Sequence, residues 1–150
     1  MTTLPTSTER VAIREGLFAG ALDALDRVQL AGSSCNACGE VHLGTVHLCP
    51  NCGNGSLTSL ALHPSGTLWT YTILRFKPPG DFRGSEPFKP RPCGLVELPD
   101  GVRVLAPLDI PEEDLVIGMH VRLRASPLYM DDADREVIAF SFAPAEEPPV

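Results

Sequence analysis

The residues best suited to do chemistry are four cysteines in two Cys-x-x-Cys pairs, Cys35 with Cys38 and Cys49 with Cys52. A two-residue spacer lets both thiolates of a pair reach one metal ion from a tight turn. A glycine follows each pair, and glycine can adopt the positive φ that such a turn needs. The spacing predicts a four-thiolate zinc site, which should be structural because four protein ligands leave no open coordination position.

Other residues near this motif offer weaker candidates. Iron held by the same four thiolates, as in a rubredoxin-type electron carrier, is the main alternative to zinc. His42 and His47 lie between the two pairs and are expected to be exposed strand residues rather than ligands. Cys93 has no partner in sequence, and free cysteine is most often a small buried side chain. Because the chain shows no Ser-His-Asp grouping, glycine-rich phosphate loop or paired carboxylates, we predict no catalytic residue and do not expect a self-contained enzyme.

Length and charge limit the class of protein. The chain has 150 residues and a formal net charge of -7, which fits one domain or a small module joined to a compact one. The acidic balance argues against an extended nucleic-acid-binding face. We expect a cytoplasmic protein without a membrane anchor, because no secretory signal or long apolar run is apparent. Thiols stay reduced in that compartment, which favours metal ligation over disulfides.

Basic residues gather between Arg75 and Arg91, where both lysines of the chain lie against only two acidic residues. The segment from Lys77 to Pro92 is rich in proline, and a long loop of this kind is usually functional or disordered. We expect it to meet a small polyanion, such as a nucleotide-bearing cofactor, although a merely solvated charge run is the alternative. The candidate contacts are Phe76, Lys77, Arg83, Lys89 and Arg91.

The N-terminal segment has the pattern of an amphipathic helix. Thr6 and Glu9 form a capping box, and apolar residues from Val11 to Val28 recur at spacings of three, four and seven. Gly16 and Gly20 lower the helix propensity. The pattern therefore predicts one helix or a helical hairpin.

After the cysteines the apolar period changes from near 3.6 to near 2, which is typical of β-strands. Trp69 and Tyr71 should share one face of their strand, with Leu68 on the other, and Trp69 or Phe76 would more often lie in the core. An aromatic face beside basic loops could alternatively bind single-stranded nucleic acid. The expected strands span residues 57–63, 66–76, 93–98, 102–108, 119–125 and 136–142, with one helical turn at 110–115.

Several short strands with one helical interruption predict a mainly β chain that ends in a five- to six-stranded OB-fold barrel. The expected division is a helical segment at residues 1–30, a zinc ribbon at 31–56, the OB-fold at 57–143 and a disordered tail at 144–150.

The order of these parts resembles one known family. GLFAGAL, then CNACG and CPNCG, then GTLWTYTILRF, PCGLVELPDGVRVLAPL and DLVIGMHVRLR follow one another along the chain. This series is similar to acyl-CoA-associated proteins that join a rubredoxin-like zinc ribbon to an OB-fold, a family long known as a domain of unknown function. The resemblance runs roughly from Arg14 to Phe142.

The resemblance implies a non-catalytic accessory subunit of a hetero-oligomer with a thiolase-superfamily enzyme. Such a subunit would bind structural Zn²⁺ through Cys35, Cys38, Cys49 and Cys52, stabilise its partner and help hold coenzyme A or acyl-CoA. The preferred setting is an acyltransferase complex for thiolytic cleavage of a 3-oxoacyl-CoA derived from an aromatic or steroid-like compound. There are two alternatives: this chain is the partner of an acyl-CoA aldolase or hydratase, or it is itself a single-stranded nucleic-acid-binding OB-fold protein. The resemblance transfers no role to Cys93.

Overall fold

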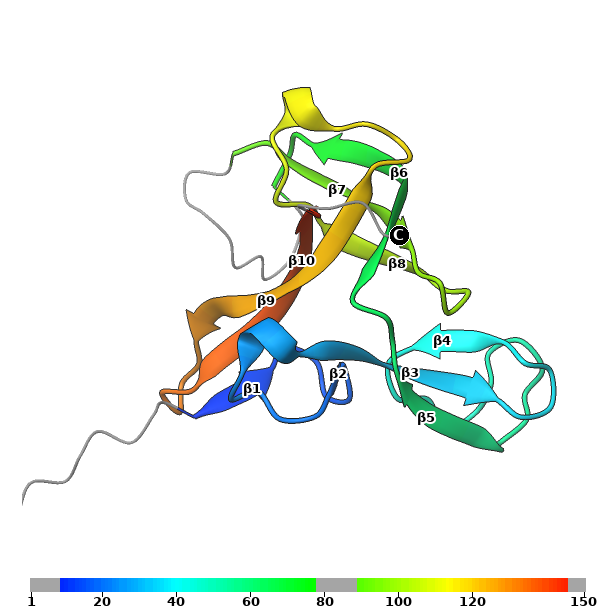
Figure 1. Cartoon of the computed structure of the whole chain (residues 1–150). Helices are drawn as coiled ribbons and strands as arrows, with labels where there is room; N and C mark the ends of the chain where they lie inside the picture. The colour runs from blue at the N-terminus through cyan, green and yellow to red at the C-terminus, as the bar shows by residue number, and fades with distance from the viewer. Residues whose placement is uncertain (1–8, 78–88, 146–150) are drawn as a thin grey trace, which may run out of the picture.

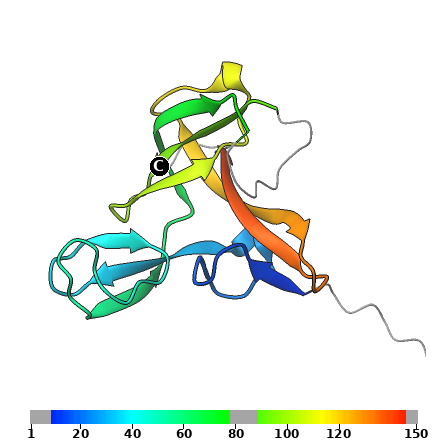
Figure 2. The same cartoon turned by 180° about the vertical axis from the view of Figure 1, so that it is seen from behind.

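The computed structural model describes residues 9–77 and 89–145, and Figures 1 and 2 show it from opposite sides. The described part of the chain is mainly β, as the alternating sequence pattern predicts. Its helical elements are two short 3₁₀ turns, η1 at Leu25–Arg27 and η2 at Glu112–Asp114. Among these residues, no helix has the length and apolar character needed to cross a membrane.

Six strands form the larger sheet, in the order β1-β10-β9-β6-β7-β8. The sheet closes where Leu108, just after β8, makes a parallel bridge to Phe142 in β10, and the Asp109 amide donates to the Phe142 carbonyl at 2.8 Å. Antiparallel neighbours that close through a parallel contact of the third and fifth strands, β8 and β10, form the partly closed barrel of an OB-fold. The bounds are β1 Arg10–Ala12, β6 Ser65–Leu74, β7 Arg91–Glu97, β8 Arg103–Pro107, β9 His120–Met130 and β10 Glu136–Pro144.

A smaller sheet carries the cysteine motif. Its central strand β3, Gln29–Cys35, pairs with β2 (Phe18–Ala19), β4 (Val41–Leu43) and β5 (Leu57–Ala61). Figure 1 shows β3 running out of the barrel region into this sheet. Residues 57–61, which the sequence pattern assigned to the barrel, therefore pair with the ribbon strand β3.

The predicted N-terminal helix is wrong for the described residues. Val11 of β1 pairs in parallel with Val137 of β10, and Phe18 of β2 pairs with Leu30 of β3. Gly16, between β1 and β2, and Gly20, directly after β2, have φ of +77° and +84°, which ends any helical path. The apolar residues thus recur at helical spacing while contacting two different sheets, and tertiary pairing overrides the periodicity. Thr6 of the expected capping box lies outside the described residues.

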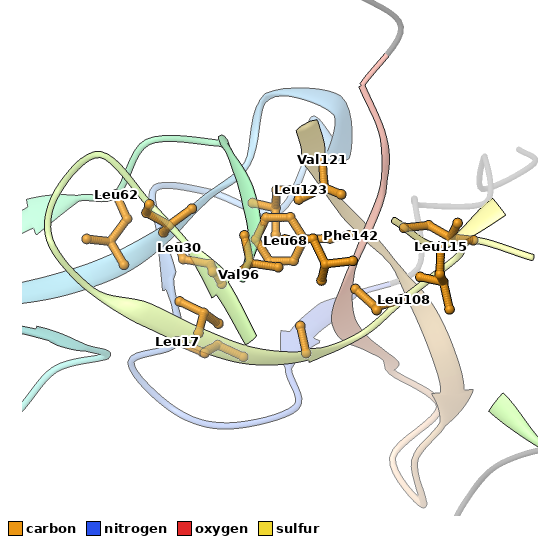
Figure 3. Packing of buried hydrophobic residues seen from close by; sticks show 14 residues of the cluster. Leu17, Leu30, Leu62, Leu68, Val96, Leu108, Leu115, Val121, Leu123 and Phe142 are labelled. Carbon is orange, nitrogen blue, oxygen red and sulfur yellow. The ribbon is translucent and has the colours of Figure 1, made fainter. Parts of the chain in front are cut away.

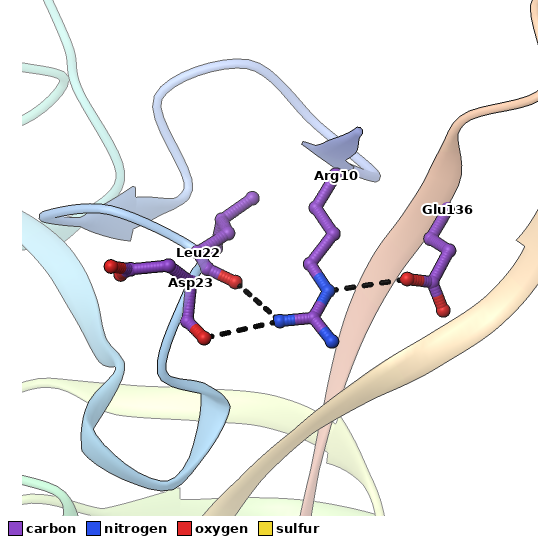
Figure 4. A network of polar contacts seen from close by, with 4 residues as sticks. All are labelled: Arg10, Leu22, Asp23 and Glu136. Atoms are coloured by element: carbon purple, nitrogen blue, oxygen red, sulfur yellow. Dashed lines mark hydrogen bonds and ion pairs between the residues drawn. The ribbon is translucent and has the colours of Figure 1, made fainter. Parts of the chain in front are cut away.

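Arg10 fixes the N-terminal segment between the two sheets, as Figure 4 shows. Its Nε donates to the Glu136 carboxylate of β10 at 3.2 Å. The same guanidinium donates through Nη1 to the backbone carbonyls of Leu22 at 3.0 Å and Asp23 at 3.3 Å. Because one half-buried cation satisfies both an acid and two carbonyls, it ties β1, β10 and the loop before η1 together.

Barrel and ribbon share one hydrophobic core, seen in Figure 3. Leu30 of the ribbon and Leu62 at the junction are almost completely buried with barrel residues such as Leu68 and Phe142. The Leu62 amide also donates to the Leu30 carbonyl at 2.7 Å. The two modules therefore pack against each other through a common core and are not joined by a linker alone.

An irregularity in β6 changes which of its side chains share a face, compared with the expected alternation. Leu68 lies opposite Val96 and Tyr71 opposite Gly94, with a register shift at Trp69. An extra residue at a β-bulge moves all later side chains to the other face, so Leu68 and Tyr71 share a face and Trp69 lies on the outside. Trp69 is 46% exposed and Phe76 is 86% exposed, so neither occupies the core where it was expected.

Gly94 marks a close approach that we use to test the barrel. A Cβ at this position would lie 2.5 Å from the Thr70 carbonyl oxygen in the neighbouring strand. Gly94→Ala should therefore lower the free energy of unfolding by about 1–3 kcal/mol through overpacking, measured by urea denaturation. Gly55→Ala is the control, because its Cβ would make an ordinary contact at 3.6 Å. Equal unfolding midpoints for the two variants would contradict this packing.

Candidate metal centre and basic segment

The two cysteine knuckles have the same backbone design. The Cys35 amide donates to the Glu40 carbonyl at 2.9 Å, and the Cys49 amide donates to the Asn54 carbonyl at 2.8 Å. Inside each loop the glycine amide donates to the carbonyl of the first cysteine, Gly39 to Cys35 at 2.9 Å and Gly53 to Cys49 at 2.7 Å. Those glycines have φ of +81° and +79°, as the sequence predicts. Two matching turns thus aim their thiols at a common point.

The four sulfurs form one cluster. All four Sγ atoms lie within 4.8 Å of one another, and the pairs Cys35–Cys52 and Cys38–Cys49 are each 3.6 Å apart. In a tetrahedral zinc site with Zn–S bonds of about 2.3 Å, neighbouring sulfurs are about 3.8 Å apart. The two 3.6 Å separations match this value, so the cluster fits a tetrahedral zinc ion, and its four cysteines would complete the coordination shell. Among the described residues, this is the one group with the arrangement of a metal site.

Neighbouring groups hydrogen-bond the sulfurs rather than add ligands. His42 Nε2 lies 3.3 Å from the Cys49 sulfur, a contact that the expectation of a plain exposed strand residue missed. Asn51 Nδ2 donates to the Cys38 sulfur at 3.5 Å, and the Ala37 amide donates to the Cys35 sulfur at 3.4 Å. Donors around a ligand orient it and stabilise its ionised form.

The cysteine pKa values differ because four thiols share a small volume. The Cys38 amide, with help from the Ala37 amide, lowers the pKa of Cys35 from 9.0 to about 6. The Asn54 amide lowers the pKa of Cys52, but the sulfurs of Cys35, Cys38 and Cys49 together with burial outweigh it and raise that pKa to about 12. The Cys35 thiol therefore ionises more readily than a free thiol, while the Cys52 thiol keeps its proton. A dication removes this conflict because it neutralises the sulfurs together.

The structure describes the two ends of the basic segment, just after β6 and at the start of β7. Arg75 is tied to Glu112 of η2 by a 3.0 Å ion pair, and Phe76, Lys77 and Lys89 are exposed. Arg91 begins β7 and is half buried. Arg83 lies outside the described residues.

Trp69 carries a contact that sequence reasoning did not anticipate. The Arg103 guanidinium lies over the Trp69 ring, 4.0 Å from its centroid, while Arg103 Nε donates to Glu97 at 3.0 Å. A cation already covers one face of this exposed ring, so that face is not open to a stacking base.

Sequence reasoning also missed a groove on the outside of the barrel. Its volume is about 630 Å³. Arg91 and Cys93 of β7 line one side of it, with Leu105 of β8, and Leu128 of β9 lines the other. Cys93 is half buried on the outer face of the sheet, where it faces this groove. The signal in the sequence was weak, because the lining residues come from strands that are far apart along the chain.

The metal centre predicts a specific zinc content. The purified chain should be colourless and contain one zinc ion, and Cys49→Ser should weaken zinc binding by more than about 100-fold, beyond the about 10–100-fold that loss of an outer-shell partner costs. Cys93→Ser should keep the metal. Metal analysis by mass spectrometry measures both. An iron-coloured protein, or full zinc in Cys49→Ser, would contradict the assignment.

Zinc binding should release protons. Because folding lowers the pKa of Cys35, its thiolate stabilises the folded chain above pH 9.0, and this contribution disappears as pH falls through about 6. Folding instead raises the pKa of Cys52 to about 12, so this thiol stays protonated at lower pH in the metal-free chain. Zinc must displace that proton to bind the sulfur. Titrating metal-free chain with zinc at about pH 7 in weak buffer should release at least one proton per chain. Zinc affinity should also fall from about pH 8 to about pH 5. Affinity that is independent of pH would disprove thiolate ligation.

Comparison with known proteins agrees with both modules. Residues 22–58 match the family described as "ChsH2, rubredoxin-like zinc ribbon domain", and residues 61–126 match "ChsH2, C-terminal OB-fold domain". A DUF35 domain-containing scaffold protein of Pyrococcus furiosus is 31% identical over 79% of this chain and 85% of its own length. A protein of the same description from Methanothermobacter thermautotrophicus is 27% identical over 77% of this chain and 85% of its own.

A solved structure described as "Ltp2-ChsH2(DUF35) aldolase" is similar at 26% identity and a TM-score of 0.56. The match covers 77% of this chain and 84% of that one. Identity above 30% over most of both lengths, together with matches to the two modules in the same order, makes the chain a member of the DUF35 family, with a ChsH2-type zinc ribbon followed by an OB-fold.

Proposed function

We propose that this chain is a non-catalytic, zinc-stabilised accessory subunit of an enzyme complex that acts on CoA thioesters. The observation that carries the proposal is its 31% identity to a protein described as a scaffold, over 85% of that protein's length. The metal chemistry supports it, because a cluster of four thiolates stabilises a fold and leaves zinc no position for substrate. The partner would supply the nucleophile and the acid and base groups.

Two reactions of the partner are open to test. The family resemblance in the sequence favours a thiolase-like subunit that cleaves a 3-oxoacyl-CoA, derived from an aromatic or steroid-like compound. The similar solved structure is described as an aldolase, and this observation favours carbon–carbon cleavage by a retro-aldol step as the second candidate. In either case a CoA thioester is the substrate and this chain is the smaller subunit.

The basic segment is the proposed contact for the coenzyme. Phe76, Lys77, Lys89 and Arg91 lie at the adjoining ends of β6 and β7, and Arg83 belongs to the same stretch of sequence. Lysine and arginine side chains bind phosphate through charge-assisted hydrogen bonds. The exposed Phe76 ring, at 86%, is available to pack against the adenine of coenzyme A.

Affinity capture tests the assignment of this chain as a subunit. A tagged chain, purified from its native cells, should bring down a thiolase-superfamily protein in equal amount, identified by mass spectrometry. Assays of the captured complex with a 3-oxoacyl-CoA and with a 3-hydroxyacyl-CoA then distinguish thiolysis from aldol cleavage. A nucleic-acid-processing partner, or no stoichiometric partner, would show that the proposed function is wrong.

Charge reversal tests the coenzyme contact separately. Lys89→Glu combined with Arg91→Glu should weaken coenzyme A binding by the complex about 10–100-fold through repulsion of its phosphates, measured by calorimetry, while the complex stays assembled. Arg122→Glu combined with Arg124→Glu is the matched control, because it changes the net charge by the same amount at two exposed arginines of β9 that lie outside the basic segment. Unchanged affinity in the double variant would remove the basic segment from the binding site.

A further inference from the structure

The four sulfur-bearing residues of the zinc site differ in how far they are open to solvent. Cys35 and Cys49 are each 2% exposed, whereas Cys38 and Cys52 are exposed, so each knuckle holds one buried and one exposed cysteine. Both knuckles lie at the end of the ribbon sheet where β3 ends and β5 begins, which is the end remote from the barrel in Figures 1 and 2. A small solute can therefore reach the exposed pair without disturbing the shared core.

Hydrogen-bond donors distinguish the two exposed cysteines. The Cys38 sulfur accepts from the Asn51 side chain at 3.5 Å and from the Glu40 amide. The Cys52 sulfur accepts from the Asn54 amide, and no other donor outside the four cysteines reaches it from the part of the chain that the structure describes. Donors stabilise a thiolate, and a more stabilised thiolate is a weaker nucleophile. Cys52 is thus the more reactive of the two exposed ligands.

The contacts between sulfurs join the two knuckles in pairs. Cys52 Sγ lies 3.6 Å from Cys35 Sγ, and Cys38 Sγ lies 3.6 Å from Cys49 Sγ. Each pair combines an exposed sulfur with a buried one. The second pair is the better protected, because His42 Nε2 also lies 3.3 Å from the Cys49 sulfur. An oxidised Cys52 would therefore meet the Cys35 sulfur as its neighbour in the other knuckle.

We infer that Cys52 is a modification site for hydrogen peroxide and that Cys35 converts the product into a disulfide, with release of zinc. The Cys52 thiolate attacks one peroxide oxygen and the O–O bond breaks, which leaves a sulfenic acid and a hydroxide that takes up a proton to give water. The Cys35 thiolate then attacks the Cys52 sulfur, the S–O bond breaks, and the second hydroxide leaves as water. Two thiolates, one peroxide and two protons thus give one disulfide and two molecules of water, and the peroxide is the oxidant.

The modification has a reversible effect on the ribbon. A disulfide between the knuckles removes two of the four ligands, and two thiolates do not complete the tetrahedral shell that holds a structural zinc ion. Reduction by a thiol restores both ligands by disulfide exchange. The inference depends on the zinc site alone, so it stands or falls independently of the function proposed for the complex.

Oxidation of the zinc-loaded, full-length chain tests the inference, with Cys93→Ser as background so that the thiol outside the cluster does not react. One equivalent of hydrogen peroxide per chain should release one zinc ion for each disulfide formed, read with a chromogenic chelator. Peptide mapping after alkylation of free thiols should find Cys35 linked to Cys52. A first link within one knuckle, a first link between Cys38 and Cys49, or zinc that stays bound after oxidation would overturn the inference.

Matched variants test why Cys52 reacts first. Asn51→Ala removes the side-chain donor to the Cys38 sulfur, so the link from Cys38 to Cys49 should then compete with the wild-type link. His47→Ala is the control, because His47 is an exposed polar residue between the knuckles, and it should leave the wild-type map unchanged. Both variants keep all four ligands, which zinc content and thermal unfolding check before oxidation. An Asn51→Ala map identical to that of the wild type would contradict selection by hydrogen bonding.

Discussion

Four thiols held within 4.8 Å of one another are the constraint on which the rest of the ribbon depends. They cannot all ionise without a cation, as the opposite pKa shifts of Cys35 and Cys52 indicate. Zinc removes that conflict and fixes both knuckles. The knuckles in turn hold the ends of β3, β4 and β5, a sheet too small to be stable on its own core. The metal thus supplies order that the apolar residues of this module cannot.

That order reaches the barrel through shared packing. Leu30 and Leu62 belong to the same buried cluster as Leu68 and Phe142, and Arg10 links β1 and β10 to the loop before η1. A ribbon that is fixed to the barrel presents a rigid composite surface, which suits an accessory subunit because little freedom is lost on assembly. The described ends of the basic segment adjoin β6 and β7, and the outer groove is lined by barrel residues, whereas the four sulfurs belong to the ribbon. The zinc site and the proposed coenzyme surface therefore have separate roles. The zinc site stabilises the chain, and the barrel provides the surface proposed to face the coenzyme.

The features that sequence predicted are those set by local spacing. Cysteine pairs with following glycines define their own turn, and alternation located the strands that form the barrel. The helix predicted for the N-terminal segment was wrong because Val11 and Phe18 lie in strands that pair with other strands of the fold. The spacing of apolar residues along the chain does not show such pairing. The prediction of which β6 side chains share a face was wrong from Trp69 onward, because one bulged residue reverses the alternation there. The groove needs Leu105, Leu128 and Arg91 from three strands, so it exists only after the barrel closes.

An accessory subunit completes a catalytic subunit without performing the chemistry itself. The most direct measurement of this division of labour is turnover of a CoA thioester by the captured catalytic subunit, prepared alone and with the wild-type chain, with this chain by itself as the third arm. We expect full turnover only when both subunits are present, and none from this chain by itself. Turnover by this chain alone, or a catalytic subunit whose rate and stability do not change when the chain is removed, would contradict the proposed role.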